Sequence, residues 1–163
     1  MSTSSADIPL LYRLFFLYIE PLSALVGSYF AAGQPTAYLT YLAPTPAGAL
    51  AAQAPPTATL VSLYQLSNLY LLFALNEHLV LSSTRARGVW RALLFGLLVA
   101  DLGHLATMVP VAQEKGFAAV FLRFWGWNAM EWGSVGFVYA GAAMRSAFLL
   151  GVGLGREGKA KSE

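Results

Sequence analysis

Cysteine is absent from the chain of 163 residues, and charged residues make up only 11% of it. The absence of cysteine excludes disulfide bonds, cysteine-ligated metals and a thiol nucleophile. The sequence also lacks a Gly-x-Ser-x-Gly nucleophile motif, a His-Glu-x-x-His metal motif and a glycine-rich phosphate loop ending in Lys-Ser or Lys-Thr. These absences disfavour serine, cysteine and metal-dependent hydrolases, and we expect neither a metal ion nor a cofactor.

Hydrophobic residues make up 57% of the chain, and its mean hydropathy is +0.58. Several apolar runs exceed the roughly 18 residues that cross about 30 Å of hydrocarbon as a helix. The sequence therefore predicts an all-α protein, a single integral membrane domain of four transmembrane helices around a polar cavity. We expect the helices at residues 8–32, 58–81, 89–109 and 126–152, followed by a mobile cytoplasmic tail over 156–163.

The net charge is +2 and the isoelectric point is near 9.0. The basic residues lie mainly outside the apolar runs, which suits contact with anionic lipid better than nucleic acid binding. Beside the helix ends, one side carries Arg85, Arg87, Arg91, Arg156, Lys159 and Lys161, and the other carries Lys115 and Arg123. The positive-inside rule then places both termini in the cytoplasm, and we expect the endoplasmic reticulum as the host membrane.

Residues 33–56 hold five of the eight prolines and no charged residue. We interpret this segment as an ordered or partly re-entrant loop, with Tyr38 and Tyr41 at the membrane interface. Pro110 is expected to end the third helix. Residues 117–125 are predicted to lie in the interface before the fourth helix begins.

The predicted spans contain ionisable and amide side chains, which are costly in hydrocarbon. A charged side chain at a helix centre costs about 2.5 to 3.5 kcal/mol on insertion scales. We therefore expect these polar residues to face each other, or water, inside the bundle. They are Glu20, Gln65, Asn68, Asn76, Glu77, His78, Asp101, His104, Asn128 and Glu131.

Spacing places some of these residues together. Asp101 and His104 are three residues apart, as are Asn128 and Glu131. Each pair is therefore predicted to share one helix face. With Glu20, the two pairs would meet near mid-depth in a water-poor chamber.

Acids in such a chamber point to proton-transfer chemistry on a lipophilic substrate that enters from the bilayer. A carboxyl group removed from water keeps its proton to higher pH and can act as an acid, whereas a carboxylate beside histidine can act as a base. The catalytic candidates are Glu20, Glu77, Asp101 and Glu131, and the substrate-binding candidates are His104, Asn128, Trp127, Trp132 and Tyr70. The alternative for the acids is interhelical polar contact, and for the tryptophans packing or interface contact.

Four segments carry a resemblance to known proteins: LYRLFFLYIEPLSAL, LNEHLV, DLGH and WGWNAMEWG. With them the chain resembles small fungal integral-membrane epoxide hydrolases and cyclases of aurovertin- and citreoviridin-type polyketide pathways. More distantly, it is similar to the emopamil-binding protein and sterol isomerase group, whose intramembrane Glu, His, Asn and Trp protonate an alkene. The resemblance implies a small helical membrane enzyme of secondary metabolism.

Three functions remain open at this point. The leading hypothesis is an epoxide hydrolase or cyclase that acts without a cofactor on a lipophilic polyketide or terpenoid. The second is a sterol-type alkene isomerase, and the third is a non-catalytic lipid-binding membrane protein. Ala129-x-x-x-Gly133 and Gly151-x-x-x-Gly155 permit close helix contact within the bundle or in a homodimer.

Overall fold

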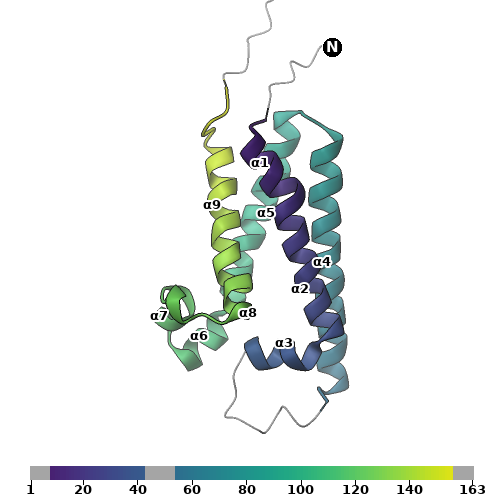
Figure 1. The fold of residues 1–163 in the computed structure, drawn as a ribbon, viewed down its shortest axis with the longest axis vertical. Coiled ribbons are helices and arrows are strands. Elements are labelled where there is room, and N and C mark those ends of the chain that lie inside the picture. Colours follow the sequence, from purple (N-terminus) through teal and green to yellow (C-terminus); the bar gives the residue numbers. More distant parts are fainter. Residues whose placement is uncertain (1–7, 43–53, 156–163) are drawn as a thin grey trace, which may run out of the picture.

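The computed structural model describes residues 8–42 and 54–155, and these residues form helices without any strand (Figure 1). The all-α class is therefore confirmed. Three helical runs, Leu10–Gly33, Thr57–Ser83 and Arg87–Lys115, are long and apolar enough to cross a membrane, consistent with an integral membrane protein. The predicted tail, with its three basic residues, lies outside the described residues.

The first run is a helix with a local irregularity near its middle. It consists of α1 (Leu10–Leu14), a π-helical segment (Phe15–Ile19) and α2 (Glu20–Gly33). Pro21 has no N–H, so it cannot bond the Leu17 carbonyl one turn earlier. The His78 ring of α4 (Thr57–Ser83) lies there instead, with Nδ1 2.8 Å from the Leu17 oxygen. Because a carbonyl only accepts, Nδ1 carries the proton.

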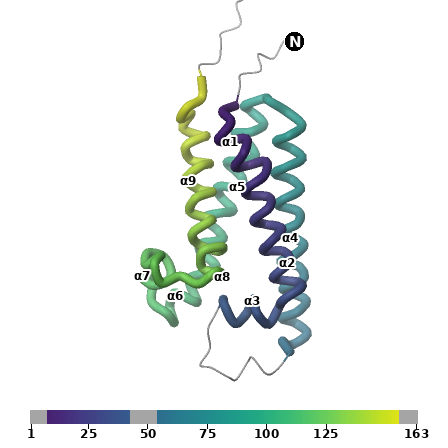
Figure 2. Tube along the Cα trace, in the orientation of Figure 1, coloured from purple at the N-terminus to yellow at the C-terminus, as the bar shows by residue number. Residues whose placement is uncertain are grey.

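The helices are arranged as two antiparallel pairs, α2 with α4 and α5 (Arg87–Thr107) with α9 (Phe137–Leu149), as the tube in Figure 2 shows. Small side chains let α2 and α4 approach closely. The Ser28 hydroxyl donates to the Ser67 carbonyl at 3.0 Å, and the Ser67 hydroxyl donates to the Ser28 carbonyl at the same distance. Gly27 lies against the Tyr70 ring, which a Cβ atom would meet at 3.4 Å.

Short helices close the end of the bundle opposite to the described chain ends (Figure 1). They are α3 (Pro35–Leu42), α6 (Val109–Lys115), α7 (Phe117–Phe121), a 3-10 turn (Phe124–Gly126) and α8 (Ala129–Glu131). A second π-helical segment (Trp132–Gly136) joins α8 to α9. The fourth long helical run therefore begins at Ala129 and ends at Leu149, inside the predicted 126–152.

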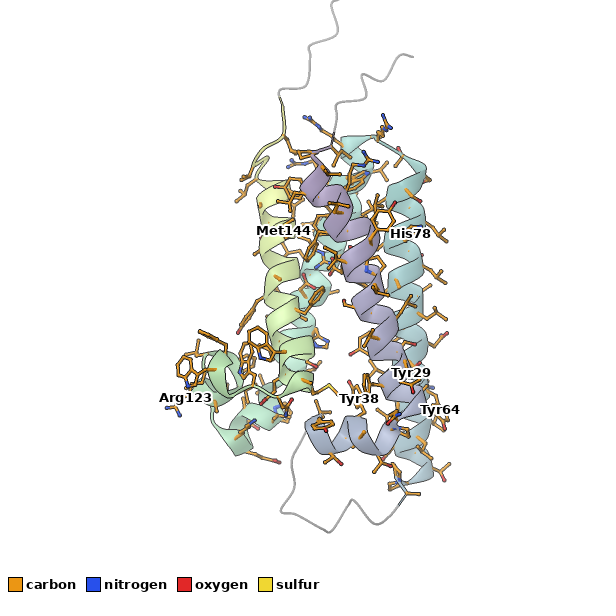
Figure 3. The ribbon with its side chains drawn as sticks, in the orientation of Figure 1. Tyr29, Tyr38, Tyr64, His78, Arg123 and Met144 are labelled. Atoms are coloured by element: carbon orange, nitrogen blue, oxygen red, sulfur yellow. The ribbon has the colours of Figure 1, made fainter. Side chains whose placement is uncertain are left out.

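Part of the segment expected to be a loop is helical, because Pro35 suits the first turn of α3, where its missing N–H costs nothing. Tyr38 lies inside the protein, and its expected place at the membrane interface stays a prediction. It is 6% exposed and packs with Ala31 and Leu63, and Figure 3 places it at α3 beside the bundle interior. Tyr41 is 50% exposed, as an interfacial side chain would be.

Three amides lie on the outside of the bundle, contrary to the expectation that all polar side chains of the spans face inward. Gln65, Asn68 and Asn76 are all exposed on α4. Glu77, the next residue, is fully buried, because successive residues of a helix point about 100° apart. The interior of the bundle thus contains the buried acids of the long helices, whereas these three amides face outward.

Replacing His78 by Phe should lower the free energy of unfolding by about 1 kcal/mol, because the Leu17 carbonyl loses its donor. In a Pro21→Ala background the same replacement should lower the free energy of unfolding by a clearly smaller amount, because the backbone N–H of residue 21 can then donate to the Leu17 carbonyl. The measurement is unfolding in mixed detergent micelles as a double-mutant cycle. His78→Asn, whose side-chain amide can keep the donor near the Nδ1 position, is the control. Equal losses in both backgrounds would contradict this account.

Candidate functional site

A buried arginine on α9 brings together one acid from each of the other three long helices. Arg145 Nη1 donates to Asp101 Oδ2 of α5 at 2.5 Å. Arg145 Nη2 donates to Glu20 Oε1 of α2 at 2.5 Å, and it lies 3.5 Å from Glu77 Oε1 of α4. We call these four residues the Arg145 cluster. It links the α2–α4 pair to the α5–α9 pair.

The Arg145 cluster is almost completely removed from solvent. The side chains of Arg145 and Glu77 are 0% exposed, and those of Glu20 and Asp101 are 7% and 10% exposed. The rings of Phe16 and Phe73 lie 5.7 and 5.8 Å from the guanidinium carbon, within the range of cation–π attraction. Among the described residues, three buried atoms of the cluster lack a hydrogen-bond partner: Glu20 Oε2, Glu77 Oε2 and Arg145 Nε.

Charge balance decides what this arrangement can do chemically. One guanidinium faces three carboxyl groups, so the cluster is neutral when two of the three carry protons. Excess negative charge in a low-dielectric interior is strongly unfavourable. A coupled set of carboxyl groups of this kind can contain proton donors and a proton acceptor within one site.

Local backbone features make room for the guanidinium. Gly141 lies one turn before Arg145 on α9, and a Cβ atom there would come within 2.7 Å of Arg145 Nη1 and 3.0 Å of Glu20 Oε1. Glu20 directly follows the π-helical segment Phe15–Ile19. A π turn inserts one residue into a helix and so changes the direction of the residues after it.

Glu131 and Asn128 form a separate site, and the expectation that they share one helix face is wrong. Asn128 precedes α8 as its N-cap: its Oδ1 accepts from the Glu131 backbone N–H at 2.9 Å, and the Asn128 N–H donates to Glu131 Oε2 at 2.9 Å. This reciprocal pair is a capping box, which also has a spacing of three residues. Lys115 of α6 forms an ion pair with Glu131 Oε1, and Asn128 Nδ2 donates to the Tyr41 carbonyl at 3.0 Å.

The capping box joins α3, α6 and α8 at the closed end of the bundle. Among the described residues, no hydrogen bond or ion pair connects Glu131 to the Arg145 cluster. The sequence thus predicted correctly that acids of three spans meet, but the fourth acid lies elsewhere. Its catalytic role stays a prediction.

The predicted substrate-binding residues are spread over the bundle. His104 is half-buried one turn from Asp101, and its Nε2 lacks a partner among the described residues. Trp127 donates from its indole N–H to the Ala119 carbonyl at 3.1 Å and packs edge to face on Trp132, whose exposure is 50%. Their role in substrate binding stays a prediction.

An apolar groove of about 360 Å³ lies between the first helical run and α4. Leu17 and Pro21 line one side, and Ala74 and His78 line the other. Pro21 and His78 are the chain neighbours of Glu20 and Glu77. The enclosed polar cavity expected at the acids stays a prediction, since the cluster itself is packed. Among the described residues no group of three or more ligating side chains is arranged to hold a metal ion.

Two basic residues of these sites, Arg145 and Lys115, were not among the predicted site residues. Lys115 is predicted only to lie beside a helix end. Arg145 lies within the fourth predicted span, between Met144 and Ser146, but is not among the polar residues predicted to face the interior. The signal that indicates such a residue is charge balance, because acids buried in several spans need a cation at similar depth.

Gly141→Ala should displace the guanidinium and lower the free energy of unfolding by more than about 1 kcal/mol, because the new methyl group would overlap Arg145 Nη1. Gly103→Ala on α5 is the matched control, since a Cβ atom there meets nothing within 4 Å. It should be neutral or slightly stabilising, because alanine favours helix. Unfolding in detergent micelles measures both. Equal stability of the two variants would contradict the close packing at Gly141.

Residues 5–155 match a family described as a domain of unknown function, DUF7704. No curated protein and no solved structure matches the chain. The matched segment includes every residue of the Arg145 cluster and of the capping box at α8. Because the match covers most of the sequence, the chain belongs to the DUF7704 family.

Proposed function

We propose that this protein is a membrane-embedded, cofactor-independent epoxide hydrolase or cyclase that acts on a lipophilic polyketide or terpenoid of fungal secondary metabolism. The observation that carries the proposal is the Arg145 cluster, which holds three carboxyl groups around one guanidinium in a dry interior. Such a set can supply an acid and a base together. The choice of an epoxide as the electrophile rests on the resemblance of the sequence to fungal membrane epoxide hydrolases.

The distances favour a division of roles within the cluster. Glu77 is farthest from the guanidinium, at 3.5 Å, and is fully buried, so it is the proton donor to the epoxide oxygen. Asp101 is bound by Arg145 at 2.5 Å and is the most exposed of the three acids, so it is the carboxylate that activates the nucleophile. Glu20 accepts a hydrogen bond from Arg145 Nη2 and so positions the guanidinium.

The proposed reaction consumes no oxidant or reductant. As the epoxide C–O bond breaks, the proton of Glu77 moves to the epoxide oxygen. Water, or a hydroxyl group of the substrate in a cyclisation, attacks the carbon and gives its proton to Asp101. Transfer of that proton back to Glu77 through the coupled carboxyl groups restores the starting state.

The apolar groove beside the cluster supports access from the bilayer. Its volume of about 360 Å³ lies within the range of sites for small molecules. Its lining includes Pro21 and His78, so a lipophilic substrate held there lies one residue along the chain from Glu20 and Glu77.

For the membrane arrangement, we infer four spans, with the run Ala129–Leu149 as the fourth. The Arg145 cluster is compatible with burial in hydrocarbon when two of its three acids carry protons, because it is then neutral. The basic turn with Arg85 and Arg87 lies at the same end of the bundle as the described ends of the chain. This supports cytoplasmic termini, with the endoplasmic reticulum as the host membrane.

A second candidate is a non-catalytic lipid-binding protein whose cluster only joins the helices. The observation that favours it is the absence of exposed surface on Arg145 and Glu77. Buried polar groups of this kind can determine how helices associate. An alkene isomerase would use the same acids but would protonate carbon.

Glu77→Gln and Asp101→Asn should each lower the rate of epoxide opening by about 10²- to 10⁴-fold, because each removes one proton-transfer group. The assay supplies a racemic diepoxide of farnesyl acetate to purified protein in ¹⁸O-labelled water and measures labelled diol or cyclic ether, and its enantiomeric excess, by mass spectrometry and chiral chromatography. Glu114→Gln is the control, since Glu114 is an exposed acid of α6. Its rate should equal that of the wild type.

Three results would overturn the proposal. The wild type could give the racemic products of spontaneous opening, or the cluster variants could keep the wild-type rate. Solvent deuterium could also enter carbon of an alkene substrate without epoxide opening, which would identify an isomerase. Unfolding of each variant in micelles separates loss of activity from loss of the fold.

A further inference from the structure

The outer face of α4 combines amides with leucines at a regular spacing. Gln65, Leu69, Leu72, Asn76 and Leu79 follow one another at alternating intervals of four and three residues, and all five are exposed. This is the spacing of the contact positions in a left-handed helix pair. The exposed fractions of the three leucines are 59%, 49% and 58%. We call this surface the α4 face, with Asn68 at its border.

The amides of the α4 face lie too deep for contact with water. The 27-residue helix is about 40 Å long, against about 30 Å of hydrocarbon. Asn76 lies seven residues before the end of α4, which is about 10 Å from that end. Asn68 lies eleven residues after the start of α4, which is about 16 Å from the start. In a helix centred across the bilayer, both residues fall within the hydrocarbon layer. An amide there without a partner is unfavourable, so the α4 face has a partner of its own.

We propose that the α4 face is the contact surface of a parallel homodimer, in which Asn76 and Asn68 form hydrogen bonds to the amides of a second copy. The inference is independent of the proposed catalysis. An amide both donates and accepts, so two identical amides across a two-fold axis satisfy each other. Two copies inserted with the same orientation place equal depths of α4 side by side. The site is therefore complementary to itself.

Other positions in the molecule fit this role less well. The outward surface of α5 carries apolar side chains such as Phe95, Val99 and Leu102. Such side chains can face lipid without a protein partner. Within α4 itself, the opposite face is occupied by α2 through Ser67 and Ala74. Within residues 8–42 and 54–155, the amide-bearing surface of α4 is not covered by another helix, which suits a partner.

Disulfide cross-linking tests the proposal without any background mutation, because the chain contains no cysteine. Leu72→Cys places a thiol at a contact position, and Leu71→Cys places one at the same depth but about 100° away, on a residue that is also exposed, at 41%. The proteins are oxidised with copper phenanthroline in nanodiscs and in native membranes. Non-reducing electrophoresis then measures the dimer. Leu72→Cys should give at least about fivefold more dimer than Leu71→Cys.

A second measurement tests the amides. Asn68→Leu with Asn76→Leu, added to Leu72→Cys, should lower the dimer yield at least about fivefold, because the hydrogen bonds between copies are lost. Val99→Leu, on the lipid-facing surface of α5, is the control and should leave the yield unchanged. Unfolding in micelles verifies the fold of each variant. Equal cross-linking of Leu71→Cys and Leu72→Cys, adducts only with other proteins, or a yield that does not depend on the amides would each overturn the homodimer.

Discussion

The burial of one guanidinium group constrains the whole arrangement of helices. Arginine remains charged in proteins, and Arg145 has no exposed surface. A buried charge costs several kcal/mol unless it is paired. Its partners come from α2, α4 and α5, so each of these helices has to approach α9 with a particular residue at a particular depth. The Arg145 cluster thereby sets the register between the two helix pairs.

The sequence was sufficient to predict the acids of the Arg145 cluster but not its cation. Glu20, Glu77 and Asp101 stand out because they interrupt apolar runs, and hydrocarbon forces such groups together. Arg145 lies only four residues before the end of α9, where an arginine is usually explained by extension of its side chain to the interface. Gly141 favours the other interpretation, in which Arg145 points into the bundle, because a glycine one helical turn away leaves space for the guanidinium.

The tract Asn128 to Glu131 illustrates a limit of spacing arguments. A separation of three residues fits two residues on one helix face, and it fits equally an N-cap with the third residue of the helix that follows. Only the position of the helix start distinguishes the two. That start is at Ala129, after a 3-10 turn that the apolar composition of the segment does not reveal. The same limit applies to the outward amides of α4, because hydropathy gives a span but not the orientation of its faces.

The Arg145 cluster contains more carboxyl groups than cations, and this excess supports the proposed chemical role of the cluster. A structural pair needs one acid for one arginine, and each further acid adds desolvation without improving the charge balance. Serine or asparagine would supply hydrogen bonds between helices at lower cost, as Ser28 and Ser67 do here. Two acids that become neutral only when they carry protons are therefore unfavourable as purely structural contacts between helices. They are well suited to giving and taking protons in a place that water does not reach, and this favours a chemical role for the cluster.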